Sequence, residues 1–289
     1  MKKNICPLAL LILALIAVWG LSPRMASSTQ APAKESVFDR VLRTGVLRCA
    51  YAVYPPETIK DPNTGKLSGT IVETTEEVGR QLGLKIEWTA EVGFLDVFTG
   101  LKTGRYDAFC SGAYENPQRA KEALFTIPFN YGATRIFVRA DDTRFDESPD
   151  AINDPKITIA HIDGEITQFI IDESFPKARH YSLPALTDIS QTLESVATRK
   201  ADVTFLQAGP ARGFMEHNPG KLRILQKFPA RVFAAPLIAV PLGEHDLKYL
   251  LDATIRTLQE NGFVESVLQK YDPTLDSYLL VAKPYRKPF

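Results

Sequence analysis

Short apolar runs rich in β-branched residues alternate along this chain with amphipathic stretches, two of which end at a glycine, Gly83 and Gly104. A glycine directly after an amphipathic stretch is typical of a helix C-terminus. We expect a first series of strand, helix, strand, helix and strand at 46–51, 73–82, 84–88, 95–103 and 108–110. Strands that alternate with helices in this order need right-handed crossovers and form a parallel sheet. The sequence therefore predicts an α/β fold.

A second series of the same kind follows the polar stretch at 141–155. Its strand, helix, strand, helix and strand are expected at 157–161, from about 166, near 180, at 190–198 and at 203–206. The segments 101–109 and 196–205 both consist of a helix end, a turn that contains an aspartate, and an apolar strand. This repetition predicts two lobes of one architecture.

The chain after the second series returns to the apolar character of the first lobe. A strand and two helices are expected at 237–240, 245–260 and 263–271. The chain would then cross between the lobes twice, near Arg139 and near Ala230, and two crossings form a hinge. The expected division is a first lobe at 34–139 plus 231–275, a second lobe at 140–230, and a C-terminal tail at 276–289.

The N-terminal segment has the layout of a secretory signal peptide, with Lys2 and Lys3, an apolar run at 7–21, and small and polar residues at 26–33. The apolar run has roughly 15 residues and is short of the ~20 that cross a bilayer as a helix. Cys6 lies before this run, whereas a lipoprotein needs its cysteine directly after it. We expect residues 1–33 to be removed and the mature protein to be periplasmic. The alternative is an uncleaved N-terminal anchor.

The charge balance points away from polyanionic partners. The chain has 34 Lys and Arg, 34 Asp and Glu, and no block of like charges. Nucleic acid and membrane surfaces are therefore poor candidates as main partners, and the ligand should bind in a pocket. After loss of the signal peptide only Cys49 and Cys110 remain. They end neighbouring strands and could lie close together, but such strands rarely give good disulfide geometry, so we expect two buried free thiols.

One short segment, 111–119, carries the strongest local signal for a binding site, because it follows the expected strand at 108–110. Ligands of open α/β sheets bind at the carboxyl ends of the strands. Asn116 and Pro117 suit the start of a helix, whose free N–H groups would face the crevice. Arg119 adds a planar fork that matches a carboxylate. The segment therefore predicts an anion site, the alternative being that Arg119 pairs with a neighbouring glutamate on the surface.

Several segments in order carry a resemblance to a known family. They lie at 45–48, 54–56, 65–69, 82–84, 101–108, 111–112, 119 and 125–129, and more loosely at 159–164, 200–202 and 268–271. Over roughly 36–275 the chain thus resembles the amino-acid-binding family of bacterial extracellular solute-binding proteins, family 3. The resemblance implies the two-lobe type II periplasmic-binding-protein fold, with two parallel-type sheets flanked by helices and joined by a two-strand hinge. It also implies a monomeric, non-enzymatic receptor without cofactor, which closes on a small carboxylate ligand and delivers it to an ABC-type membrane permease.

The resemblance assigns the carboxylate half of the binding site. Arg119 corresponds to the arginine that clamps the ligand carboxylate. Ser111 and Gly112 correspond to hydrogen-bond donors of the first lobe. Tyr54 corresponds to an aromatic residue that packs over the ligand.

The ammonium half of the site departs from the family. The usual second-lobe acid is replaced by Gln207, the first-lobe aspartate by Ala52, a threonine by Glu165, and a polar turn residue by Tyr114. Burial of an ammonium group without an anionic partner costs roughly several kcal/mol of binding free energy. Either an acid such as Glu165 takes over, with Asp163 and Glu73 as further candidates, or the ligand has no amino group. In the second case an organic or aromatic acid would stack between Tyr54, Phe94 and Tyr114.

Two other functions are compatible with the same fold. Cyclohexadienyl dehydratases resemble this family, and there a carboxyl group, for which Glu165 is the candidate here, would act as general acid. Such an enzyme would convert prephenate or arogenate to a product that absorbs ultraviolet light. A sensory receptor for a signalling partner would share the binding chemistry. The four histidines lack metal-ligand spacing, so we expect no metal site.

Overall fold

The structure is a computed structural model that describes residues 35–228, 233–234, 236–273 and 277–281. The predicted signal peptide at 1–33 and the predicted crossing at Ala230 lie outside the described residues. Within the described ranges, no helix combines the length and the hydropathy that crossing a membrane requires.

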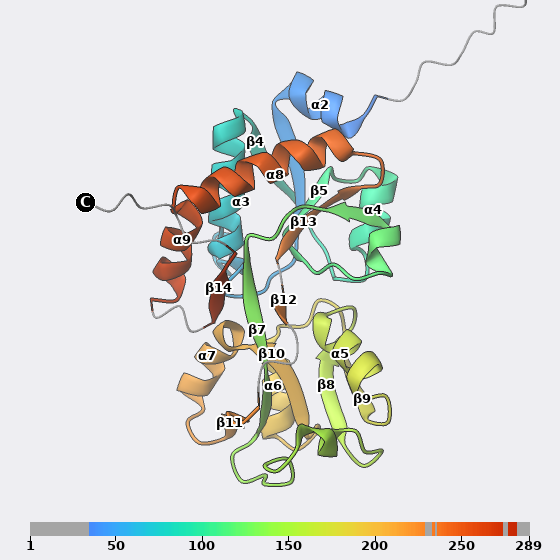
Figure 1. The fold of residues 1–289 in the computed structure, drawn as a ribbon, viewed down its shortest axis with the longest axis vertical. Helices are drawn as coiled ribbons and strands as arrows, with labels where there is room; N and C mark the ends of the chain where they lie inside the picture. Colours follow the sequence, from blue (N-terminus) through green and yellow to red (C-terminus); the bar gives the residue numbers. More distant parts are fainter. Residues whose placement is uncertain (1–34, 229–232, 235, 274–276, 282–289) are drawn as a thin grey trace, which may run out of the picture. The chain divides into compact units, whose positions relative to one another are not determined.

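Helices and strands alternate through most of the described chain (Figure 1). The helices are α2 (Val37–Thr44), α3 (Thr70–Leu82), α4 (Val97–Thr103), α5 (Ile166–Ser174), α6 (Ser190–Ala197), α7 (Ala208–His217), α8 (His245–Glu260) and α9 (Phe263–Tyr271), with short 3-10 turns at η1 (Arg119–Lys121) and η2 (Pro149–Ile152). The strands are β1 (Val46–Tyr51), β2 (Ile59–Lys60), β3 (Leu67–Ser68), β4 (Lys85–Glu91), β5 (Ala108–Ala113), β6 (Ala123–Phe125), β7 (Asn130–Arg139), β8 (Thr158–Ile162), β9 (Arg179–Leu183), β10 (Val203–Gln207), β11 (Leu222–Ile224), β12 (Phe233–Ala234), β13 (Leu237–Pro241) and β14 (Tyr278–Leu280).

The first lobe is built on a five-stranded sheet with the order β4-β1-β5-β13-β6. Strands β4, β1 and β5 are parallel, as the alternation of strands and helices predicts. Strand β13 returns from the second lobe and runs antiparallel to β5, and β6 runs antiparallel to β13. The sheet is therefore mixed, with a parallel part made by the first series and an antiparallel edge.

The second lobe repeats this arrangement. Its sheet has the order β11-β7-β10-β8-β9, in which β9, β8 and β10 are parallel and β7 is antiparallel to β10. The order β9-β8-β10-β7 thus matches β4-β1-β5-β13 of the first lobe, including the direction of the fourth strand. The predicted two-lobe α/β fold is confirmed.

An aspartate holds the same place in each lobe. Asp107 is fully buried and accepts a 2.7 Å hydrogen bond from the backbone N–H of Arg48 in β1. Asp202 accepts one of 3.0 Å from the N–H of Thr158 in β8. Each aspartate also pairs with arginine side chains, among them Arg48 for Asp107 and Arg139 for Asp202. The repeated aspartate of the sequence therefore ties each third strand to the first strand of its series.

Strand β7 links the two lobes (Figure 1). Its first residues, Asn130 to Ala133, pair with β14 and β12, and its remainder pairs with β10 and β11 in the second-lobe sheet. We infer that the first lobe ends near residue 133, earlier than the expected boundary at 139. Strand β14 lies in the segment 276–289, which was expected to be a C-terminal tail, and it pairs with the part of β7 that crosses between the lobes.

Two local expectations are wrong. The helix expected from Asn116 is only the three-residue turn η1, because β6 begins two residues after it and leaves no room for a helix. Asn116 still accepts a 2.8 Å hydrogen bond from the N–H of Arg119 through Oδ1. The expectation of two free thiols is also wrong, since Cys49 and Cys110 form a disulfide. Their Cα atoms are 5.6 Å apart on neighbouring strands, a separation that a disulfide spans.

Candidate functional site

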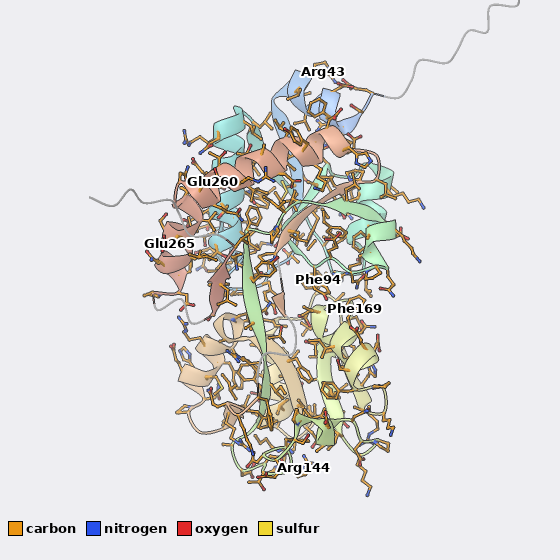
Figure 2. All side chains as sticks on the ribbon, in the orientation of Figure 1. Arg43, Phe94, Arg144, Phe169, Glu260 and Glu265 are labelled. Carbon is orange, nitrogen blue, oxygen red and sulfur yellow. A yellow bond between two sulfur atoms is a disulfide. The ribbon has the colours of Figure 1, made fainter. Side chains whose placement is uncertain are left out.

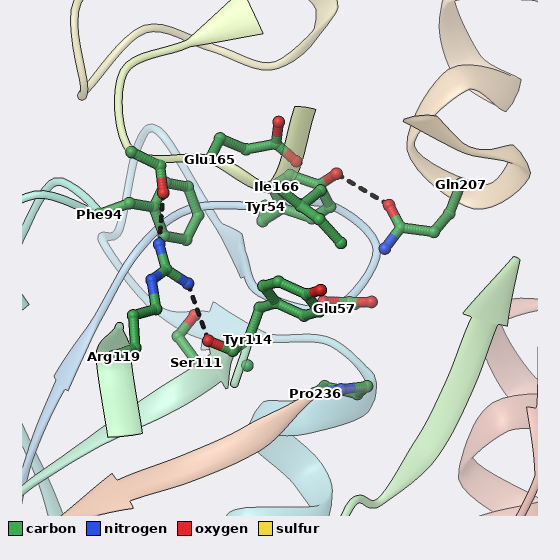
Figure 3. Close-up of a pocket in the computed structure, with 12 residues that line it drawn as sticks. Tyr54, Glu57, Phe94, Ser111, Tyr114, Arg119, Glu165, Ile166, Gln207 and Pro236 are labelled. Carbon is green, nitrogen blue, oxygen red and sulfur yellow. Dashed lines mark hydrogen bonds between the residues drawn. The ribbon is translucent and has the colours of Figure 1, made fainter. Parts of the chain in front are cut away.

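A pocket of about 40 Å³ lies where the two lobes meet (Figure 3). All eight residues that the sequence singled out for ligand binding line it: Tyr54, Phe94, Ser111, Gly112, Tyr114, Arg119, Glu165 and Gln207. Four further residues complete the lining: Glu57, Gly164, Ile166 and Pro236. The positions follow from the fold, because the pocket lies at the carboxyl ends of β5, β8 and β10, where α/β sheets bind ligands.

Arg119 turns into this pocket, so the alternative of a surface ion pair is wrong. The residue is 8 % exposed and lines the cavity. Its Nη1 donates to the main-chain oxygen of Tyr114 at 2.9 Å, and its Nη2 donates to that of Gly164. Burial lowers the pKa of Arg119 to about 10, so the guanidinium stays charged at neutral pH. The pocket therefore contains a desolvated positive charge held by both lobes.

Two aromatic rings enclose the guanidinium. The centroid of the Phe169 ring lies 4.8 Å from Cζ of Arg119, and that of the Phe98 ring lies 5.7 Å from it. Phe98 belongs to α4 of the first lobe and Phe169 to α5 of the second. Figure 2 labels Phe169 near Phe94 at the junction of the lobes. Cation–π contacts of this kind stabilise a buried guanidinium without removing its hydrogen-bond donors.

Ser111 and Gly112 form the floor of the pocket at the end of β5. The hydroxyl of Ser111 donates to the main-chain oxygen of Ala52 at 2.6 Å and lies 2.6 Å from Oγ1 of Thr58. This hydroxyl is therefore already hydrogen-bonded within the first lobe. Gly112 has φ +79, a backbone conformation that favours glycine, and a Cβ here would stand 2.7 Å from Cδ1 of Ile71 and displace the end of that side chain.

Tyr54 and Gln207 join the lobes on the other side of the pocket. The Tyr54 hydroxyl donates to Oε1 of Gln207 at 2.9 Å. Burial, together with the nearby Glu165 carboxyl, raises the pKa of Tyr54 well above its usual value, so the phenol keeps its proton. Phe94 packs edge-on against Tyr54, with ring centroids 6.3 Å apart. The three aromatic residues between which an aromatic acid was expected to stack, Tyr54, Phe94 and Tyr114, therefore all line the pocket.

Glu165 points into the pocket and also begins a helix. Its Oε2 accepts a 2.8 Å hydrogen bond from the N–H of Thr167, so it is the N-cap of α5. The residue is 4 % exposed, and burial raises the pKa of its carboxyl. The other acids proposed as substitutes lie elsewhere: Glu73 pairs with Lys270 at 2.7 Å, and Asp163 accepts from Ser182.

Glu57 is a pocket residue that the sequence reasoning missed. It is 6 % exposed, and its main-chain oxygen accepts a 3.0 Å hydrogen bond from Ile71 N–H at the start of α3. Its Oε2 lies 3.3 Å from the place where a Cβ would stand on Gly112. Burial first, and the Glu165 carboxyl second, raise the pKa of Glu57 to about 8. The available signal was an acidic residue directly after the segment 54–56, which carries the family resemblance.

The structure brings together two of the four histidines. His161 and His180 approach with Nε2 and Nδ1 3.1 Å apart, and burial lowers the pKa of His161. Among the residues that the structure describes, no group of three or more His, Cys, Asp or Glu side chains could hold a metal ion.

Known proteins are similar to this chain in sequence. A probable amino-acid ABC transporter-binding protein of Haemophilus influenzae is 34 % identical over 123 residues, which are 42 % of this chain and 47 % of that protein. The alignment with this relative thus spans about half of its length. A cyclohexadienyl dehydratase of Pseudomonas aeruginosa is 25 % identical over 249 residues, which are 86 % of this chain and 90 % of that enzyme.

Solved structures confirm the fold. The crystal structure of an ancestral amino-acid-binding protein, described as a precursor of cyclohexadienyl dehydratase, superposes with a TM-score of 0.71. That superposition covers 82 % of this chain and 99 % of the other, at 20 % sequence identity. The sequence model of one family matches residues 47–274. The chain belongs to the bacterial extracellular solute-binding proteins, family 3.

Proposed function

We propose that this protein is a periplasmic receptor that captures a small carboxylate-bearing ligand between its lobes and delivers it to an ABC-type permease. The observation that carries the proposal is the buried guanidinium of Arg119, which lines the interlobe pocket and contacts both lobes. A planar guanidinium in a desolvated site favours a carboxylate, which accepts two parallel hydrogen bonds from it. The family and its transporter-associated members support the same role.

Lobe closure is the step that couples binding to delivery. Arg119 and Tyr54 come from the first lobe, and Gly164, Glu165 and Gln207 from the second, so a ligand in the pocket contacts both. A ligand with contacts to both lobes shifts the population toward the closed state, because the open state offers only half of these contacts. The permease would then distinguish the loaded receptor from the free one by its shape.

The localisation and the partner follow from this role. The layout of residues 1–33 supports export with cleavage of the signal peptide. The permease is the proposed membrane partner, and we propose that the receptor itself is a monomer. Export is tested by the N-terminal sequence of the protein recovered from a periplasmic fraction.

A thermal-shift panel of amino acids and organic acids tests the receptor function. A ligand at a thousand times its dissociation constant stabilises the folded state by about 4 kcal/mol, which raises the melting temperature by several degrees in a chain of this size. We expect such a shift with at least one carboxylate-bearing compound and its loss in Arg119→Ala. A panel without any shift would contradict the proposal.

A dehydratase is the second candidate function. It is favoured by the buried carboxyls of Glu57 and Glu165, whose raised pKa values are typical of general acids, and by the Pseudomonas aeruginosa relative. Both carboxyls equally suit the binding of a cationic group on the ligand of a receptor. Incubation of the purified protein with prephenate, followed by ultraviolet absorbance, separates the two functions. Turnover that Glu57→Gln or Glu165→Gln abolishes would establish the enzyme.

A further inference from the structure

The carboxyl of Glu57 has no structural partner in the described part of the chain. No hydrogen bond or ion pair is formed there by its side chain, although the residue is only 6 % exposed. Its main chain is fixed instead: the oxygens of Pro56 and Glu57 accept from Thr70 N–H at 3.1 Å and Ile71 N–H at 3.0 Å. The side chain is thus held at the pocket by a rigid backbone.

Such a carboxyl destabilises the protein without its ligand. An acid without a partner in a desolvated site loses its hydration, and it either keeps its proton or carries an uncompensated charge. An apolar side chain would fill the same space without this cost. The packing of the described residues therefore gives no structural reason for an acid at this position.

The charges around the pocket identify that reason. Among its twelve lining residues one side chain, Arg119, is cationic and two, Glu57 and Glu165, are acidic. Among the described residues Arg119 forms no ion pair with either carboxyl, since its guanidinium donates to the main-chain oxygens of Tyr114 and Gly164 instead. With both carboxyls ionised the lining has one positive and two negative side chains, and a ligand of net charge +1 would balance this excess and favour ionisation of Glu57.

The larger cavity next to the pocket is also lined by more acidic than basic side chains. A cavity of about 410 Å³ shares Tyr54 and Phe94 with the pocket. Its charged lining consists of one basic residue, Lys60, and three acidic residues: Asp61, Glu91 and Asp188. A cleft lined mainly by one sign of charge concentrates ligands of the opposite sign. The approach to the pocket therefore favours a cation as well.

We propose that Glu57 is the anionic subsite of the pocket and that it selects amino acids that carry a second positively charged nitrogen. This inference rests on the proposed receptor function, because the ligand carboxylate is assigned to Arg119. The α-ammonium and the side-chain cation of such a ligand would supply the two positive charges that Glu57 and Glu165 require. A neutral amino acid leaves one of these two carboxyls uncompensated and must bind more weakly.

Calorimetric titration of the purified protein tests this selection with matched probes. L-Ornithine, L-lysine and L-arginine place the second cation at three distances from the α-carbon, whereas L-norleucine keeps the chain and lacks the second cation. We expect the best of the three basic amino acids to bind at least about 30-fold more tightly than L-norleucine, since its second cation gains a charge-assisted contact with the Glu57 carboxyl that L-norleucine cannot make. Equal affinity for L-norleucine overturns the inference.

Two variants connect the selectivity to the residue. Glu57→Gln should bring the affinity ratio of the best basic amino acid to L-norleucine within about threefold, because the amide has the same shape without the charge. Glu77→Gln is the matched control. Glu77 lies on α3, its carboxyl pairs with Arg80 at 2.6 Å, and it does not line the pocket. It should leave the ratio unchanged. A ratio that survives Glu57→Gln contradicts the role of Glu57.

Cadaverine separates a failure of this inference from a failure of the receptor function. It has the two cations of lysine and no carboxylate. If cadaverine binds as tightly as L-lysine, the carboxylate site at Arg119 is wrong. If L-norleucine binds and the basic amino acids do not, the receptor function stands and the inference is wrong. Absence of binding by all probes overturns the inference, and the receptor function is then decided by the thermal-shift panel of amino acids and organic acids.

Discussion

Arg119 of the first lobe donates a hydrogen bond through Nη2 to the main-chain oxygen of Gly164 in the second lobe. The same guanidinium donates to Tyr114 O of its own lobe at 2.9 Å. One buried side chain thus presents a positive charge to the pocket and connects the two lobes. Its loss should affect ligand affinity through both effects.

Arg119→Ala is expected to lower the affinity for the best ligand of the thermal-shift panel by about 2 to 5 kcal/mol, because the ligand carboxylate would be buried without its partner. Arg119→Lys should recover part of this loss, since the ammonium keeps the charge but lacks the planar fork. Isothermal titration calorimetry on both variants measures the effect. A loss of less than about tenfold in Arg119→Ala would contradict the assignment, because a surface pair contributes roughly 1 kcal/mol or less.

The Tyr54–Gln207 contact gives a second test of closure, because its 2.9 Å hydrogen bond also crosses between the lobes. A saturating ligand should reduce the radius of gyration in small-angle scattering, with the interior of each lobe unchanged. Tyr54→Phe removes one interlobe hydrogen bond and should weaken ligand binding by about 0.5 to 1.5 kcal/mol. The liganded variant should still reach the smaller radius. An unchanged radius in the wild type, with binding shown by calorimetry, would rule out a closing clamp.

The regular elements of this chain could be predicted because residues near each boundary determine where the element begins and ends. Strand β1 and helices α8 and α9 lie at 46–51, 245–260 and 263–271, as the sequence predicts. In α2, α3 and α4 the helix ends at a glycine with positive φ, a backbone conformation that the residue type reveals by itself. The repeated aspartate likewise indicated the two-lobe topology, because in both lobes it accepts a hydrogen bond from the backbone of a neighbouring strand.

Features that depend on distant parts of the chain were not predictable in this way. The antiparallel position of β13 follows from the return of the chain from the second lobe, and the short η1 follows from the onset of β6. The segment at 208–217 forms α7 although it begins with Ala-Gly-Pro, and no local signal marked it as a helix. Glu57 was missed because only the tertiary fold brings it next to Gly112 and into the pocket.

The raised pKa of Glu57, about 8 against an ordinary value of 4.5, predicts a dependence of stability on pH. The unfolded chain loses this proton near pH 4.5, whereas the unliganded folded protein keeps it to about pH 8. The wild type should therefore lose stability as pH rises through this window, and Glu57→Gln should not. At about 1.4 kcal/mol per pKa unit the upper limit of the effect is about 5 kcal/mol, and we expect about 1 to 4.

Denaturant unfolding of the unliganded protein between pH 4 and pH 9 measures this effect. Glu57→Gln should be more stable than the wild type at pH 8 to 9 and equal to it near pH 4, where the carboxyl is protonated in both states. Glu77→Gln serves as the control, because the Arg80 side chain lowers the pKa of Glu77 and gives the opposite sign. A variant that is less stable than the wild type at pH 8 would show that Glu57 has a structural partner.

The disulfide between Cys49 and Cys110 closes a segment that runs from β1 to β5 and contains the strands β2, β3 and β4 and the helices α3 and α4. The two cysteines are 61 residues apart in sequence. A cross-link over a loop of that length removes chain entropy from the unfolded state, which corresponds to about 4 kcal/mol in the loop-entropy treatment. Both cysteines are fully buried, so the bond is shielded from reductants in the folded protein.

We therefore expect the double variant Cys49→Ala, Cys110→Ala to fold but to be about 2 to 4 kcal/mol less stable than the wild type. Urea unfolding followed by circular dichroism measures the difference, with dithiothreitol added to the unfolded wild type as a second way to remove the bond. Because the disulfide acts mainly on the unfolded state, ligand affinity in the double variant should stay within about threefold of the wild type. Thiol titration of the exported protein in denaturant provides the direct control, since it detects no thiol if the bond is formed. Two free thiols per chain would restore the expectation drawn from the sequence.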